Sequence, residues 1–222
     1  MEIATKPEQK FIAKQLRKPT GDFAEIIGKK MNHFNEFLYD FVIGLMDIKD
    51  NEIILEIGFG NGKFFDKIFS KAENLLVSGI DYSQEMVRSA YDINQSAIES
   101  GNLNLKLAES DNIPFNKNLF DKVFCNNVIY FWEEPGMHLR EIHQVLKPGG
   151  KLYTGFRSKE SSRKIPFTEY DFILYEKEEW ESILKENSFS VINSKQKSES
   201  LIKEDGKPVL LESICCIAEK RN

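Results

Sequence analysis

The chain has 222 residues, of which 41% are hydrophobic and 29% charged, so it holds enough apolar material for one folded domain. Its net charge of −5 argues against a long nucleic-acid partner, because each phosphate contact needs a lysine or arginine. No segment approaches the roughly 20 apolar residues that span a bilayer, and we expect a cytoplasmic protein without a membrane span. The cysteines Cys125, Cys215 and Cys216 lack a CxxC spacing and a nearby histidine, which predicts neither a disulfide framework nor a metal site. The oligomeric state does not follow from the sequence.

The N-terminal 50 residues have a helical pattern. Pro19 and Gly21 interrupt it and predict two helices rather than one. We therefore expect residues 1–50 to form a helical cap or lid over a main domain of residues 51–222. The apolar side chains that repeat at helical spacing in the second helix are Phe34, Phe37, Leu38, Phe41, Val42 and Leu45.

From residue 51 onward, short apolar runs alternate with helical stretches. This alternation predicts an α/β fold of the Rossmann-like, doubly wound type, with a seven-stranded, mostly parallel sheet and an antiparallel last strand. Residues 157–176 show no regular pattern and are expected to form an irregular insertion. The predicted strands are 53–57, 75–80, 103–107, 123–125, 151–156, 191–196 and 210–218. The predicted helices are 61–72, one that opens at Ser83, one that begins at Pro135, and 178–186.

The strongest motif is Glu56-Ile57-Gly58-Phe59-Gly60-Asn61-Gly62, which follows the first predicted strand. Glycines at such a turn let the backbone approach a ligand without a Cβ in the way. A dinucleotide fingerprint would need glycine at position 63, where Lys63 stands. A P-loop needs four residues between its first glycine and its Gly-Lys pair, and a serine or threonine after the lysine. Here only three residues separate Gly58 from Gly62, and Phe64 follows Lys63. Both alternatives fail on spacing.

The pattern E-x-G-x-G-x-G resembles the nucleotide loop of class I S-adenosylmethionine-dependent methyltransferases, most closely the branch that modifies quinones and other small molecules. Further segments resemble motifs of that family in the same order, and together they cover about residues 50–156. These segments are 79–83, 108–115, 120–126 and 145–150.

The resemblance implies S-adenosylmethionine as the cofactor. Asp81 would hold both ribose hydroxyls, since two carboxylate oxygens suit a vicinal diol. Glu109 would accept the adenine amino group, although the family usually has aspartate there and Asp111 is an alternative. The residues that the resemblance places around the cofactor are Glu56, Gly58, Phe59, Gly60, Gly62, Asp81, Tyr82, Glu109, Ser110 and Asn126.

The acceptor side is less defined. The cofactor itself carries the activation, so no catalytic residue is predicted. The preferred function is methylation of an unidentified small molecule; a non-catalytic, cofactor-binding partner subunit and a protein or RNA methyltransferase are the alternatives. His143 is expected in the core or an interface, and His138 on the surface. The candidates for contact with the methyl acceptor are Asn32, His33, Tyr130, Trp132 and Arg157.

Overall fold

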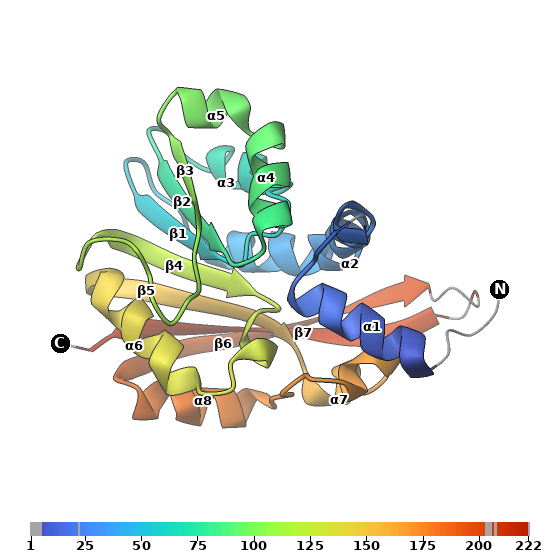
Figure 1. The fold of residues 1–222 in the computed structure, drawn as a ribbon. Helices are drawn as coiled ribbons and strands as arrows, with labels where there is room; N and C mark the ends of the chain where they lie inside the picture. Colours follow the sequence, from blue (N-terminus) through green and yellow to red (C-terminus); the bar gives the residue numbers. More distant parts are fainter. Residues whose placement is uncertain (1–5, 22, 203–205, 207, 222) are drawn as a thin grey trace.

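A computed structural model of the chain describes residues 6–21, 23–202, 206 and 208–221. It contains one seven-stranded sheet with helices on both faces (Figure 1). The elements, in chain order, are α1 (Lys6–Arg17), α2 (Phe23–Leu45), β1 (Ile53–Ile57), α3 (Phe65–Phe69), β2 (Leu76–Asp81), α4 (Gln84–Ile93), α5 (Gln95–Glu99), β3 (Leu103–Leu107), β4 (Phe120–Asn126), η1 (Ile129–Phe131), α6 (Pro135–Val145), β5 (Leu146–Arg157), α7 (Lys159–Ser162), η2 (Pro166–Glu169), α8 (Lys177–Glu186), β6 (Phe189–Ile202) and β7 (Pro208–Lys220).

The strand order is β3-β2-β1-β4-β5-β7-β6, and β7 runs antiparallel to both of its neighbours. The first five strands are parallel to one another. The predicted Rossmann-like fold with an antiparallel last strand is therefore confirmed. The chain leaves β1 toward β2 and β3, and then returns to the other side of β1 with β4. Ligands of such sheets bind outside the carboxyl ends of the strands at this switch point.

Two apolar cores cover the two faces of the sheet. One core joins the sheet to α6 and α8, which lie below the sheet in Figure 1. At its centre the fully buried Trp180 donates its indole N–H to Thr154 Oγ1 at 2.7 Å. The other core joins the sheet to α2, α3 and α4. Both faces are thus closed, as a parallel sheet with apolar strands requires.

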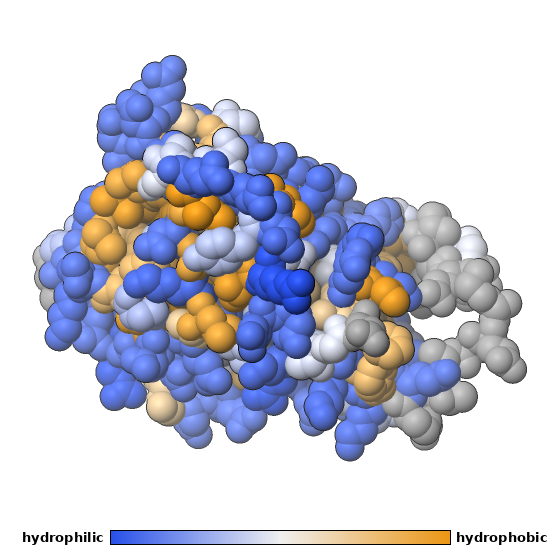
Figure 2. Space-filling model, turned by 45° about the horizontal axis from the view of Figure 1, so that its top comes forward, coloured by the Kyte–Doolittle hydropathy of each residue, from blue (hydrophilic) through white to orange (hydrophobic). Residues whose placement is uncertain are grey.

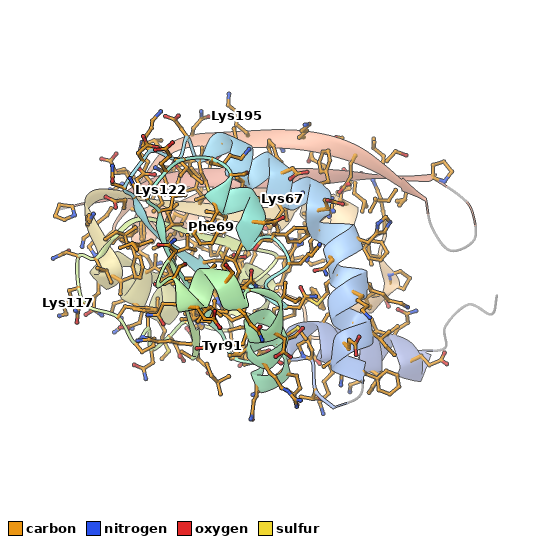
Figure 3. All side chains as sticks on the ribbon, turned by 90° about the horizontal axis from the view of Figure 1, so that it is seen from above. Lys67, Phe69, Tyr91, Lys117, Lys122 and Lys195 are labelled. Carbon is orange, nitrogen blue, oxygen red and sulfur yellow. The ribbon has the colours of Figure 1, made fainter. Side chains whose placement is uncertain are left out.

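Helix α2 belongs to this second core as well as to the N-terminal cap. Leu38 and Val42, in its C-terminal half, are fully buried and belong to the core on that face of the sheet. Its outer side is held by Lys67 of α3, which forms ion pairs with Glu36 and Asp40 (Figure 3). The N-terminal half of α2 extends past the strand ends. The helical character of the cap is present in the structure, while a boundary at residue 50 stays a prediction.

Some element bounds differ from those expected. The helix predicted over residues 61–72 is only Phe65–Phe69. It cannot include Gly62, whose φ of 72° lies outside the right-handed helical region. The expected irregular insertion contains the short helices α7 and η2. Strands β6 and β7 are longer than predicted; their polar residues pair in a long hairpin that hydrophobic patterning did not reveal.

The surface is mixed in character. Hydrophilic side chains cover most of the face drawn in Figure 2, and hydrophobic ones gather in patches toward its left half and centre. Within the described part of the chain, none of the helices has the length and apolar character needed to cross a membrane.

Candidate active site

A cavity of about 380 Å³ lies at the carboxyl ends of β1, β2, β3 and β4. Its floor is the glycine turn after β1. Its walls are the ends of β2 and β3, the turn between β4 and η1, and the start of α6. Residues of α1, α2 and the segment between them line the side opposite the sheet. The predicted binding segments therefore meet at one hollow.

The glycine turn owes its shape to backbone conformations that favour glycine. Gly58, Gly60 and Gly62 have φ values of 73°, 59° and 72°. A Cβ on Gly58 would overlap Val128 Cγ2, and one on Gly62 would lie 2.7 Å from the Cβ of Ala90. A Cβ on Gly60 would meet no atom within 4 Å. Gly58 and Gly62 are thus required by packing, whereas Gly60 borders open space in the cavity.

The carboxylate of Asp81 anchors this turn to the end of β2. Its Oδ2 accepts a hydrogen bond from the backbone N–H of Gly60 at 2.9 Å, and its Oδ1 accepts one from that of Ser83, also at 2.9 Å. Burial raises the pKa of Asp81 to about 6, although the backbone hydrogen bonds oppose this shift. A carboxylate has about four acceptor positions, so the backbone bonds from Gly60, Ser83 and Tyr82 leave it able to accept more. The carboxylate is fixed in orientation and still able to accept further donors.

Two other polar side chains are buried beside the turn without partners. Glu56 is 1% exposed, and within the described residues its Oε1 has no hydrogen-bond partner. Burial, with the nearby Asp81 charge, raises its pKa well above the ordinary value. Asn126 lines the cavity at the end of β4, and neither of its amide atoms is paired within the same part of the chain. Unpaired buried polar groups are costly, so Asn126 points to a ligand in the cavity, whereas Glu56 lies behind the turn and is not among the described lining residues.

The wall after β3 is held by α6. Ser110 Oγ lies 2.8 Å from His138 Nδ1, and the His138 ring stacks on Trp132 with centroids 4.8 Å apart. Glu109 and Asp111 also line the cavity, and Glu109 is exposed. His138, expected on the surface, is half-buried: the first turn of α6 places it in the cavity wall, which helical spacing within α6 does not reveal.

The cap is tied directly to the cofactor-binding segments predicted from the sequence. The Tyr82 hydroxyl donates to the Arg17 carbonyl, and the Ser83 hydroxyl donates to the Pro19 carbonyl at 2.7 Å. Arg17 also forms an ion pair of 3.1 Å with Glu133, across the cavity from α1. Contacts between the cap and the segment that leads into α6 thereby enclose the cavity.

Charge divides the cavity into two halves. The charged lining residues all belong to the end of α1, the ends of β2 and β3, or the segment that leads into α6. They are Arg17, Asp81, Glu109, Asp111, Glu133 and Glu134. The lining from α2 and the β4–η1 turn carries no charged side chain among the described residues. It comprises Gly28, Met31, Asn32, Asn35, Tyr39, Asn126, Asn127, Val128 and Phe131.

The five acceptor candidates occupy different places. Asn32 lines the uncharged half, while Trp132 lines the cavity beside His138. His33 is exposed on α2 and packs its ring against Phe34. Tyr130 is buried and accepts a hydrogen bond of 2.5 Å from the backbone N–H of Arg157. None of His33, Tyr130 and Arg157 is among the described residues that line the cavity.

Arg157 forms a buried cluster and is not among the described lining residues. Its guanidinium pairs with Glu199 of β6 and donates to Ser213 Oγ at 3.0 Å and to the Phe34 carbonyl at 2.9 Å. This buried cluster links α2 to the last three strands. These contacts are structural, and a contact of Arg157 with the acceptor stays a prediction.

Two lining asparagines, Asn35 and Asn127, are not among the site residues named from the sequence. Asn127 adopts a φ of 56° and donates to Asn35 Oδ1 at 2.9 Å, which joins the β4–η1 turn to α2. The position of Asn127 beside Asn126 at a strand end is a signal that indicates Asn127, since asparagine tolerates the left-handed conformation. No pattern in α2 distinguishes Asn35 from an ordinary surface position.

Comparison with known proteins identifies the family of this chain. Residues 55–154 match a family model described as a methyltransferase domain. A Bacillus subtilis protein named "Putative methyltransferase YrhH" is 31% identical over 132 residues, which are 60% of this chain and 72% of YrhH. The chain belongs to the class I S-adenosylmethionine-dependent methyltransferases.

Two further similarities show the breadth of this methyltransferase family. The "Ubiquinone/menaquinone biosynthesis C-methyltransferase UbiE" of Geotalea daltonii is 27% identical over 113 residues, 50% of this chain and 48% of that protein. The crystal structure of YcgJ from Bacillus subtilis superposes with a TM-score of 0.67 at 15% identity, covering 84% of this chain and 99% of YcgJ. At that identity the structural likeness concerns the fold alone.

Proposed function

We propose that this methyltransferase binds S-adenosylmethionine in the cavity and transfers its methyl group to an uncharged small molecule. The observation that carries the proposal is the Asp81 carboxylate, which is buried, oriented by Gly60 and Ser83, and still able to accept hydrogen bonds at the cavity floor. A nucleoside ribose offers two adjacent hydroxyl donors that match its two oxygens.

The residues present fit such a cofactor. The open space beside Gly60 admits the nucleoside next to the backbone, and Glu109, Ser110 and Asp111 form the wall for the base. The unpaired amide of Asn126 lies at the opposite end of the turn, where the amino acid portion of the cofactor would find a polar partner. The acidic lining, five carboxylates against Arg17, favours a cationic ligand.

S-adenosylmethionine supplies a methyl group already activated on a sulfonium sulfur. The protein's contribution is then alignment and exclusion of water. Asp81 and the glycine turn fix the nucleoside, while α2 and the Asn35–Asn127 bond close the cavity above it. No carboxylate, imidazole or ammonium lines the uncharged half in the described chain, so the acceptor atom would have to be nucleophilic without a side-chain base.

The uncharged half also supports the choice of acceptor. Its asparagine amides donate and accept hydrogen bonds, and Met31, Tyr39 and Phe131 add apolar surface. Such a lining suits a neutral, partly apolar small molecule better than an anionic nucleic acid, which needs lysines and arginines. The C-methyltransferase UbiE is named for the biosynthesis of quinones, which are neutral and partly apolar molecules. A non-catalytic partner subunit would have no need of an acceptor-binding half in the cavity.

Calorimetry with S-adenosylmethionine and S-adenosylhomocysteine tests the cofactor, and transfer of a radioactive methyl group to a fractionated metabolite extract tests the acceptor. We expect binding of both nucleosides and a labelled product in a neutral, organic-extractable fraction. Absence of binding at high micromolar concentration would refute the proposal. Binding without any transfer would instead favour the partner-subunit alternative, and label in tRNA or protein would favour a macromolecular acceptor.

A further inference from the structure

His138 sits in the first turn of α6 with its ring held on one side by a buried aromatic pair. Its ring and the indole of Trp132 are nearly parallel, with an interplanar angle of 7° and centroids 4.8 Å apart. Trp132 is 2% exposed and packs in turn against Trp180, with centroids 5.9 Å apart. The plane of the His138 ring is therefore set by the core rather than by solvent.

The ring is fixed by hydrogen bonding as well. Nδ1 lies 2.8 Å from the hydroxyl of Ser110, in the wall that follows β3. The same wall is bonded to α6 a second time, because the backbone N–H of Ile113 donates to Glu141 Oε2 at 3.2 Å. Two bonds from α6 thus hold the segment 110–113 in place. Glu109, just before it, is exposed and makes no comparable bond within the described residues.

The second ring nitrogen of His138 remains available. Within residues 6–21, 23–202, 206 and 208–221, no protein group forms a hydrogen bond with Nε2, and the residue lines the cavity. Burial lowers the pKa of His138 against the opposing effect of the Asp111 charge, so the ring is neutral near pH 7. A neutral, preorganised imidazole beside an open cavity can pair with a ligand at little entropic cost.

We infer that His138 determines specificity for the adenine base: its Nδ1 positions Ser110, and its Nε2 forms a hydrogen bond with an edge of the base. This inference rests on the proposed function, since it takes the nucleoside to lie against residues 109–111. It assigns base recognition to a rigid pair supplied by two elements, Ser110 after β3 and His138 on α6. Glu109, the acid expected from the sequence, is exposed by comparison.

The test measures the affinities of S-adenosylhomocysteine and of its analogue with hypoxanthine in place of adenine. His138→Phe keeps a ring to stack on Trp132 but removes both nitrogens. His138→Asn places an amide near the position of Nδ1, so it can keep the bond to Ser110 while losing Nε2. We expect both variants to bind S-adenosylhomocysteine about 3- to 10-fold more weakly and to lose most of the preference for adenine. His143→Phe, on the same helix but outside the cavity, is the matched control.

A double-mutant cycle tests the link to Ser110. If the two residues act as one unit, Ser110→Ala combined with His138→Phe binds no more weakly than His138→Phe alone. The inference would be overturned if the losses of affinity from Ser110→Ala and His138→Phe multiplied in the double variant. It would also be overturned if both His138 variants kept the wild-type affinity and preference for adenine. Because the wild-type protein would still bind the nucleoside in that case, this failure differs from failure of the proposed function, in which the wild type does not bind. His138→Asn serves if His138→Phe does not fold.

Discussion

The backbone N–H of Gly60 donates a 2.9 Å hydrogen bond to the carboxylate of Asp81, and this bond joins the turn after β1 to the end of β2. Ser83 binds the other oxygen and also caps α4, where its hydroxyl accepts from the Met86 N–H. One carboxylate therefore sets the position of a turn, a strand end and a helix start. Protonation of Asp81 should therefore weaken ligand binding in the cavity that these three elements border.

We predict that cofactor affinity rises with pH through about 6, where burial places the pKa of Asp81. Ribose donors and a sulfonium both favour the ionised carboxylate, so at pH 5 the ligand must first displace a proton. Affinity for S-adenosylmethionine at pH 5 should be about tenfold lower than at pH 7. Calorimetry from pH 5 to pH 8 measures this change. A flat profile would show that Asp81 does not contact the ligand.

Replacement of Asp81 tests the same contact at fixed pH. Asp81→Asn should weaken cofactor binding at pH 7 by on the order of 1.5–3 kcal/mol, because charge-assisted hydrogen bonds to the ligand are lost. It should also remove the change in affinity centred near pH 6. Asp92→Asn, an exposed substitution on α4, is the control and should bind as the wild type does. Unchanged affinity of Asp81→Asn would contradict the role given to this carboxylate.

Alanine substitutions at Gly60 and Gly58 should differ in their effects: the first should mainly weaken cofactor binding, and the second should mainly destabilise the fold. A methyl group on Gly60 meets no neighbouring atom, so Gly60→Ala should cost only about 1–2 kcal/mol for a left-handed alanine. The methyl group enters the cavity and should reduce cofactor affinity. Gly58→Ala adds overlap with Val128 to the same strain and should destabilise the fold more. Urea unfolding and calorimetry on both variants separate the two effects. Equal losses of stability would contradict this assignment of the two glycines.

Patterns local to one segment were enough to predict much of this molecule. Alternation of strands and helices predicted the doubly wound, mostly parallel sheet, and the Glu56–Gly62 motif and Asp81 lie at the switch point where such folds bind ligands. Their roles toward a cofactor stay predictions. Ser83 caps α4 as its position before Met86 and Ala90 indicated. These features depend on neighbours within a few residues along the chain.

Features that depend on distant segments could not be predicted in the same way. His138 meets Ser110 across 28 positions, and Arg157 meets Phe34 across 123, so spacing within either segment is uninformative. His138 was accordingly placed on the surface and Arg157 near the acceptor. The Asn35–Asn127 bond spans 92 positions and went unnoticed for the same reason. Side-chain partners between elements appear only once the topology is known.

Glu56 gives a prediction about stability. Burial raises its pKa in the folded protein, so as pH rises above its ordinary value of 4.5 the unfolded chain loses this proton first. The carboxyl therefore lowers the free energy of unfolding increasingly above that pH. Glu56→Gln carries no such penalty and should exceed the wild type in stability at pH 8 by more than at pH 4. Urea unfolding at both values measures the difference, and an equal difference at the two would show that Glu56 is not buried as a carboxyl group.

The buried ion pair between Arg157 and Glu199 predicts a purely structural effect. The two side chains are 7% and 10% exposed, so Arg157→Met would leave the Glu199 carboxylate buried without its partner. We expect a loss of about 3–5 kcal/mol in the free energy of unfolding, and recovery of most of it when Glu199→Leu is added. Because Arg157 does not line the cavity, the affinity of the folded variant for S-adenosylmethionine should be unchanged. A variant with wild-type stability and lost methyl transfer would instead return Arg157 to the acceptor side, where the sequence had placed it.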